Sequence, residues 1–220
     1  MRKVSIQSKA HFKTTKRILK YFKGTTNVAL WYPNEFNIVL SGFSDYDYAE
    51  CKLDRKSTSG TCHLLGSSLI SWNSKRQACV ALSTTKVEYI AVGHACPQNI
   101  WLKYQLIDYG VKLEKVPLYC DNTSAINLTK NLIQHFKTKH IEIRHHFIRD
   151  HIEKGETEIK FVKTENQFVD VFTKPLAHDR INKLRIELGV LNMKNFCRYL
   201  FGLLTLLGHV LAAFKVLNSA

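Results

Sequence analysis

A strand that carries acidic side chains constrains the fold of this chain more than any other segment. The apolar run from Phe36 to Leu40 leads into residues 42–47, Gly-Phe-Ser-Asp-Tyr-Asp, and together they predict a strand. Because side chains alternate between the two faces of a strand, Asp45 and Asp47 share one face. A strand seldom places carboxylates there unless they meet water, a base or a metal ion. The fold therefore has to bring a partner of one of these kinds to Asp45.

The pattern around this strand predicts an α/β domain. Alternation and turn residues predict three antiparallel strands, at about residues 37–48, 60–66 and 69–80. A long helix is expected at about 84–109, with Ser83 as its N-cap and with Pro97 kinking or splitting it. A strand at 116–120, a helix to about 130, a strand at 158–162 and helices beginning near 170 and 179 follow. This order of elements is typical of a mixed sheet with helices packed on it.

Three other segments also stand out in the sequence: one near each end of the chain and a cationic stretch between them. Residues 9–24 predict an amphipathic basic helix that begins almost at the first residue, so its packing partners are expected upstream, in a longer protein. Residues 135–153 are the most cationic stretch and predict a basic helix with one apolar side. The apolar tail at 199–214 is shorter than the roughly 20 residues that a membrane span needs, and we expect an extra helix or out-of-context sequence there rather than an anchor.

The composition favours a polyanionic partner. The chain has 220 residues, is 45% hydrophobic and carries a formal net charge of +14, for which nucleic acid is the usual partner. A basic surface without a specific partner is the alternative. The six cysteines are scattered without a CxxC pair, which argues against a zinc knuckle or a disulfide framework and favours reduced thiols in an intracellular protein. No signal peptide is visible at the N-terminus.

Four carboxylates stand where they could converge. They are Asp45 on a strand, Glu88 in what the pattern predicts as a helix's first turn, Asp121 at a strand's end and Asp170 in another first turn. Helix N-termini favour anions by about 0.3–1 kcal/mol, which would help to keep Glu88 and Asp170 ionised. Such a cluster repels itself unless divalent cations, which prefer oxygen ligands, sit in it. Two ions about 3.5–4 Å apart would suit a nuclease or another phosphoryl-transfer enzyme.

Each of these residues also has a simpler interpretation. A single Asp or Glu in such a place is more often a cap or a solvated charge than a ligand, and Asp121 before Asn-Thr-Ser could be only a helix cap. The histidines of the basic stretch suggest zinc, but no pair among them has the third ligand that a site needs, and a basic helix is favoured. Ser83 lacks the G-x-S-x-G setting of a nucleophile.

Several motifs occur together and in order between about residues 10 and 190. They are KRILKYFKGT at 16–25, GFSD at 42–45, DRKSTSG at 54–60, LISW at 69–72, VALST at 80–84, EYIA at 88–91, CDN at 120–122, RHHFIRD at 144–150 and FTKPL at 172–176. With these motifs the chain resembles the C-terminal part of the Pol polyprotein of copia-type LTR retrotransposons of plants.

The resemblance implies a domain organisation. Residues 1–35 would be a remnant of the C-terminal end of the reverse transcriptase. Residues 36–177 would form a ribonuclease H-like domain, an α/β fold with a mixed five-stranded sheet flanked by helices. Residues 178–220 would be a C-terminal helical extension with an unmatched apolar tail.

The resemblance also implies a chemistry. Asp45, Glu88, Asp121 and Asp170 would bind two Mg²⁺ ions, for which Mn²⁺ could substitute, and would cleave the RNA strand of an RNA–DNA hybrid. Specificity for RNA would come from its 2′-hydroxyl groups and from the shape of the hybrid's minor groove. The nearby candidates for contacts with the strands are Arg55, Lys56, Asn122 and Ser124, for which turn and cap chemistry is the alternative role. The upstream reverse transcriptase would be a partner, and no membrane would be involved. Whether Asp47 joins the metal site is left open.

Departures from the family pattern support a rival interpretation. Tyr46 stands where the family usually has a small residue, Glu50 where it has glycine, and Lys86 where a capping-box Glu is common. The rival is a catalytically decayed fragment that at most binds nucleic acid. An integrase-type transposase would share the fold and the metals, but its acidic set and its zinc-binding region are not found in the sequence.

Overall fold

A computed structural model of the chain describes residues 9–34, 37–48, 55–78, 80, 83–130 and 147–193. The chain forms two compact units, Tyr32–Gly189 and a smaller one made of Met1–Trp31 with Val190–Ala220. Three features singled out in the sequence lie outside the described residues: Glu50, most of the basic stretch at 135–146, and the apolar tail at 199–214.

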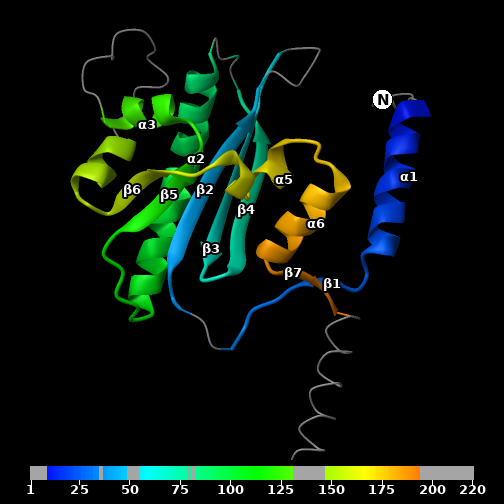
Figure 1. Ribbon diagram of the computed structural model, residues 1–220, viewed down its shortest axis with the longest axis horizontal. Helices are drawn as coiled ribbons and strands as arrows, with labels where there is room; N and C mark the ends of the chain where they lie inside the picture. Colours follow the sequence, from blue (N-terminus) through cyan, green and yellow to red (C-terminus); the bar gives the residue numbers. More distant parts are fainter. Residues whose placement is uncertain are drawn as a thin grey trace, which may run out of the picture. The chain divides into compact units, whose positions relative to one another are not determined.

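A mixed five-stranded sheet forms the centre of the larger unit, in the order β4-β3-β2-β5-β6 (Figure 1). The strands β2 (Leu40–Asp47), β3 (Thr58–Leu65) and β4 (Ser68–Arg76) are antiparallel neighbours. The strand β5 (Val116–Cys120) runs parallel to β2, and β6 (Thr157–Phe161) runs parallel to β5. The expected ribonuclease H-like architecture, a mixed five-stranded sheet flanked by helices, is thereby confirmed.

The long helix α2 (Thr84–Asp108) packs on the sheet and provides much of the core. The Ser83 side chain accepts a hydrogen bond from the backbone N–H of Lys86, as the predicted N-cap requires. Pro97 lies inside α2 and does not split it, contrary to one of the expected outcomes. Buried residues before and after Pro97, among them Val92 and Ile100, belong to one cluster with Leu118 of β5, and this packing holds the helix together across the missing hydrogen bond.

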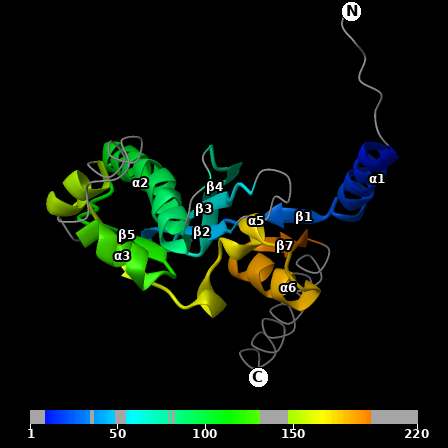
Figure 2. The same ribbon diagram turned by 90° about the horizontal axis from the view of Figure 1, so that it is seen from above.

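Shorter helices complete the larger unit. They are α3 (Thr123–Lys130), the helical residues 147–153, the 3₁₀ turn η1 (Thr164–Asn166), α5 (Asp170–Thr173) and α6 (His178–Glu187). Figure 2 shows α2 on one side of the sheet and α6 on the other. The turn η1 was not expected from the sequence, where one helix start was predicted between residues 165 and 172. The larger unit therefore combines one long, continuous helix with several short helical segments.

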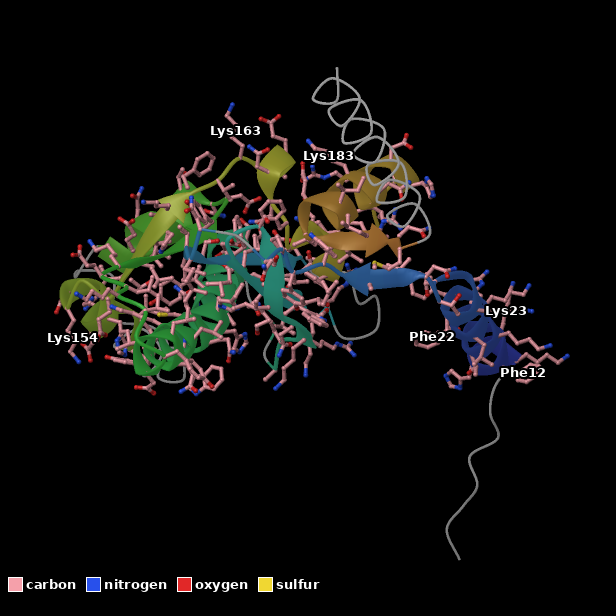
Figure 3. All side chains as sticks on the ribbon, turned by 90° about the horizontal axis from the view of Figure 1, so that it is seen from below. Phe12, Phe22, Lys23, Lys154, Lys163 and Lys183 are labelled. Atoms are coloured by element: carbon pink, nitrogen blue, oxygen red, sulfur yellow. The ribbon has the colours of Figure 1, made fainter. Side chains whose placement is uncertain are left out.

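The smaller unit joins the two ends of the chain. It contains the helix α1 (Lys9–Gly24) and a two-stranded sheet in which β1 (Val28–Leu30) pairs antiparallel with β7 (Val190–Asn192). The helix at 9–24 is confirmed, whereas β7, with three residues, was not expected. On α1 the side chains of Phe12, Leu19 and Phe22 are exposed, and two of them are labelled in Figure 3. None of the described helices combines the length and the apolar character that a membrane span needs.

Candidate active site

Two neighbouring parallel strands bring the first pair of carboxylates together. Phe43 of β2 is opposite Tyr119 of β5 in the parallel register. Asp45 lies two residues further along β2, and Asp121 lies two residues beyond Tyr119, directly after the end of β5. Residues two apart in a strand share a face, so Asp45 lies on the side of Phe43, whose ring stacks on that of Tyr119 with 4.8 Å between the ring centroids.

A third carboxylate comes from α2. One carboxylate oxygen each of Asp45, Glu88 and Asp121 lies within 4.8 Å of the other two. Asp45 is 1% exposed and Glu88 is fully buried, while Asp121 is half-buried. The group does not include Asp47, which ends β2.

Hydrogen bonds hold the acids in place, but one buried oxygen, on Glu88, has no partner among the described residues. The Cys120 thiol donates to Glu88 Oε1 at 3.1 Å, and the Thr164 hydroxyl donates to Asp121 Oδ2 at 3.2 Å. Glu88 Oε2 is buried and has no hydrogen-bond partner among the described residues. Buried carboxylate oxygens are seldom left in this way, because the lost solvation is costly.

Burial sets the protonation of the two innermost acids. It raises the pKa of Asp45 to about 6, even though the Lys174 ammonium and the Thr173 hydroxyl favour the charged form. Burial, with the neighbouring charge of Asp45, raises the pKa of Glu88 well above its usual value. The expectation that a helix N-terminus keeps Glu88 ionised is wrong: α2 begins at Thr84, Glu88 lies in the second turn, and the dipole effect fades beyond the first.

Asp170 lies apart from this group of three and reaches it through a lysine. It occupies the first turn of α5, as predicted. The Lys174 Nζ lies 2.8 Å from Asp170 Oδ1 and 3.0 Å from Asp45 Oδ1, so it forms ion pairs with both. Asp170 Oδ2 also lies 3.5 Å from Nη2 of Arg180, and the Arg180 guanidinium itself donates hydrogen bonds to the backbone oxygens of Thr164 and Glu165.

The segment after Asp170 therefore contributes more than one residue. The Thr173 hydroxyl donates to Asp45 Oδ2 at 2.5 Å, next to the Lys174 ion pair. The sequence analysis included Lys174 only as part of the FTKPL motif at 172–176 and gave it no role at the site. The i,i+4 spacing from Asp170 to Lys174 is the signal that could have indicated the pair, because residues at this spacing face each other on a helix.

The four residues predicted to contact nucleic acid lie in different settings in the structure. Asn122 Oδ1 accepts a hydrogen bond from the backbone N–H of Ala125 and so caps α3, which was its alternative role. Since Asn122 caps the helix, Asp121 is left to face the other acids. Arg55 is exposed with a positive φ of 54°, Lys56 is half-buried, and Ser124 is exposed on α3.

A basic side chain that the sequence interpretation did not include lies near the same end of the sheet. Lys75 of β4 is opposite Ser59 of β3, which is opposite Tyr46, the residue after Asp45. Lys75 is exposed. It therefore stands two strands from the acids, where a bound polyanion could meet it.

The residues present fit a hard divalent cation. The donors offered by Asp45, Glu88 and Asp121 are all carboxylate oxygens, which Mg²⁺ and Mn²⁺ prefer. A cation among them would provide the missing partner of Glu88 Oε2. It would also offset the repulsion from Asp45, which adds to burial in raising the pKa of Glu88.

Comparison with known sequences shows clear relatives. The chain is 36% identical over 182 residues to the retrovirus-related Pol polyprotein from transposon TNT 1-94 of Nicotiana tabacum, with 83% of the chain and 14% of that polyprotein covered. It is 36% identical over 181 residues to the corresponding polyprotein from transposon RE1 of Arabidopsis thaliana, with 82% of the chain and 12% of the polyprotein covered. The chain thus spans about one seventh or less of the length of these relatives. No protein-family model matches it.

Comparison with solved structures finds ribonucleases H at low sequence identity. LC11-RNase H1, isolated from compost, has a TM-score of 0.46 and 13% identity, with 66% of this chain and 97% of that one covered. RNase H1 from Halobacterium salinarum has a TM-score of 0.39 and 11% identity, with 66% of this chain and 98% of that one covered.

Proposed function

The chain is a homologue of the retrovirus-related Pol polyproteins of plant transposons, and we propose that it is the part that cleaves the RNA strand of RNA–DNA hybrids. The observation that carries the proposal is the buried group of Asp45, Glu88 and Asp121. Three carboxylates gathered in a chain with a net charge of +14 make chemical sense around divalent cations, with the basic surface left for the nucleic acid.

In this proposal the four acids are the ligands of two divalent cations. Asp45, Glu88 and Asp121 would hold one divalent cation, and Asp45 and Asp170 together would hold a second. When bound, such ions supply an activated water molecule and positive charge for the leaving oxygen of the phosphodiester. In the net reaction the water oxygen forms a bond to phosphorus, one phosphorus–oxygen bond breaks, and the departing oxygen takes up a proton.

Neighbouring groups keep the acids in place. The Cys120 thiol orients Glu88, the Thr164 hydroxyl orients Asp121, and the Thr173 hydroxyl orients Asp45. These hydrogen bonds fix the direction of the carboxylates before a cation arrives, which lowers the cost of binding it.

The nucleic acid would lie over the end of the sheet that holds the acids, where basic side chains are also found. Arg55, Lys56 and Lys75 would contact phosphates, and Ser124 would be placed to contact a sugar or phosphate. Selection of RNA would rest on contacts with 2′-hydroxyl groups. The exposed apolar side chains of α1 support a further partner, the polymerase part of the same polyprotein, since the chain covers so little of its relatives' length.

The proposal is tested by cleavage of a labelled RNA–DNA hybrid. With Mg²⁺ or Mn²⁺ the full chain should cut the RNA strand and spare single-stranded RNA, and a chelator should stop it. Asp121→Asn should slow cleavage by about a hundredfold or more, because a cation ligand is lost, while the melting temperature stays close to that of the parent. Asp108→Asn, an exposed acid at the end of α2, is the matched control and should cut at the parent rate.

Two results would count against the proposal. Parent-level cleavage by a folded Asp121→Asn variant would remove Asp121 from the site. A folded parent that binds the hybrid equally with and without Mg²⁺ and yields no product would favour the binding-only fragment instead.

A further inference from the structure

Lys174 occupies the position between two carboxylates where a second cation would have to bind. It follows α5 directly and lies four residues after Asp170. Its Nζ is 2.8 Å from Asp170 Oδ1 and 3.0 Å from Asp45 Oδ1. The two carboxylate side chains are 6% and 1% exposed, and the ammonium is the counter-charge that both members of this buried pair share.

The two halves of the acidic site therefore differ. Glu88 and Asp121 reach Asp45 with no basic side chain hydrogen-bonded to either of them among the described residues, and Glu88 keeps an unpartnered oxygen. The carboxylate of Asp170 is joined to that of Asp45 through the ammonium of Lys174. The Asp45–Glu88–Asp121 half is ready for a cation, whereas the Asp45–Asp170 half already contains the Lys174 ammonium between its two carboxylates.

Two further contacts hold Lys174 in this place. The Thr173 hydroxyl binds the other oxygen of Asp45, which leaves Oδ1 directed at the lysine. The Arg180 guanidinium, 3.5 Å from Asp170 Oδ2, is engaged by two backbone oxygens and does not reach Asp45 within hydrogen-bond distance. Lys174 is thus the residue that joins the two carboxylates.

We propose that Lys174 is a built-in competitor for the second divalent cation: its ammonium neutralises Asp45 and Asp170, and it has to move away before a cation can use both carboxylates. The inference rests on the proposed function insofar as this function needs two cations. An ammonium and a divalent cation compete here because both need the same oxygens at short distance. Cation binding then falls into a strong class at the three acids and a weak class at the Asp45–Asp170 pair.

The test is a calorimetric titration of the full chain with Mn²⁺ alone, without nucleic acid and at one fixed pH. In Lys174→Gln the weak class should become at least about tenfold tighter, because removing a unit charge a few ångströms from a cation lowers a large repulsion. The strong class should change little. Lys174→Arg keeps the charge and should keep the weak class weak.

A matched control and a second readout separate this role from a structural one. Lys183→Gln removes another lysine that pairs at i,i+4, with Glu187 on α6, and should leave both classes unchanged. In a chelator, Lys174→Gln should melt at a lower temperature than the parent, because two buried carboxylates lose their counter-charge, and saturating Mn²⁺ should remove most of the difference. A merely structural lysine would leave the difference in place.

The proposal is overturned if Lys174→Gln binds Mn²⁺ with both parent affinities, or with a weaker second class. Should Lys174→Gln not fold, Asp170→Asn decides: the weak class must disappear while the strong class remains, and loss of both would contradict the division of the site. The titration contains no hybrid, so its result does not depend on cleavage. If Mn²⁺ binds as expected but the protein fails to cut the hybrid in the cleavage assay, the proposed function is contradicted and the role of Lys174 is not.

Discussion

His63 lies in β3 with none of its side chain exposed, and its Nε2 faces the backbone oxygen of Ala95 at 3.4 Å. Its Nδ1 has no hydrogen-bond partner among the described residues. Burial lowers the pKa of this imidazole to about 4, against the weaker opposing effect of the Ala95 oxygen. The folded protein therefore keeps His63 neutral at pH values where the unfolded chain would protonate it.

This residue should make the fold sensitive to acid. Its pKa in the fold lies below that in the unfolded chain, so its contribution is complete above pH 6.5 and is lost as the pH falls through the window from 6.5 to about 4. The loss amounts to about 3 kcal/mol over this window. Urea unfolding at several pH values should show it for the parent and much less for His63→Leu. As the pH falls, Asp45 and Glu88 change the free energy of unfolding in the direction opposite to His63. The quantity to follow is therefore the difference in free energy of unfolding between the parent and His63→Leu. If this difference stays the same across the pH window, the prediction is contradicted.

At the scale of elements, the site depends on how closely α5 approaches β3. Gly60 of β3 is opposite Asp45 of β2 in the antiparallel register. A Cβ atom at Gly60 would lie 2.5 Å from Val169 Cγ1 and 2.6 Å from Thr173 Cγ2. Only a residue without a side chain lets the segment that carries Asp170, Thr173 and Lys174 lie against Asp45.

Gly60→Ala should therefore disturb both stability and the site. The added methyl group would force α5 away from β3, and overpacking of this kind costs about 1–3 kcal/mol, to be measured by urea unfolding. In the same variant the Mn²⁺ affinity of the Asp45–Asp170 pair should change, while the Asp45–Glu88–Asp121 class is affected less. Gly24→Ala at the end of α1 is the control, since a Cβ there meets nothing within 4 Å, and it should be neutral. Equal stability of both variants would show that α5 can move without cost.

At the scale of the whole molecule, an acidic site stands in a chain with a net charge of +14. In the proposed function the charges have separate roles: the buried carboxylates would bind cations, and the exposed lysines and arginines would bind a polyanion. Lys75 and Lys112 are both exposed, but Lys75 lies near the end of the sheet that holds the acids, whereas Lys112 precedes β5 and so lies at the opposite end.

Hybrid binding should fall with salt in proportion to the phosphates contacted. Measured with Asp121→Asn to prevent cleavage, the logarithm of the affinity should decrease linearly with the logarithm of salt concentration. Adding Lys75→Gln should reduce this slope by about 1, as the loss of one phosphate contact would. Lys112→Gln in the same background should leave the slope unchanged. A salt-independent affinity would mean that the basic surface does not bind the backbone.

The sequence by itself determined the order and type of most elements. Alternating apolar residues predict β2, β3 and β4, and the capped apolar stripe after Ser83 predicts α2, because local periodicity decides these elements and the core then buries them. Short segments such as η1 and β7 carry too few residues for a period, and they were missed. Pro97 predicted a kink or a split, and buried packing on both sides of it keeps α2 continuous.

The sequence also singled out Asp45, Glu88, Asp121 and Asp170 by residue type and place. What only the tertiary structure decided is how these four acids are grouped. The parallel register of β2 and β5 sets Asp45 beside Asp121, the packing of α2 buries Glu88 with them, and the close approach of α5 at Gly60 inserts Lys174 between Asp45 and Asp170. Local patterns contain the residue types, but charge pairing and burial depend on contacts between segments far apart in the chain, and these exist only once the sheet has formed.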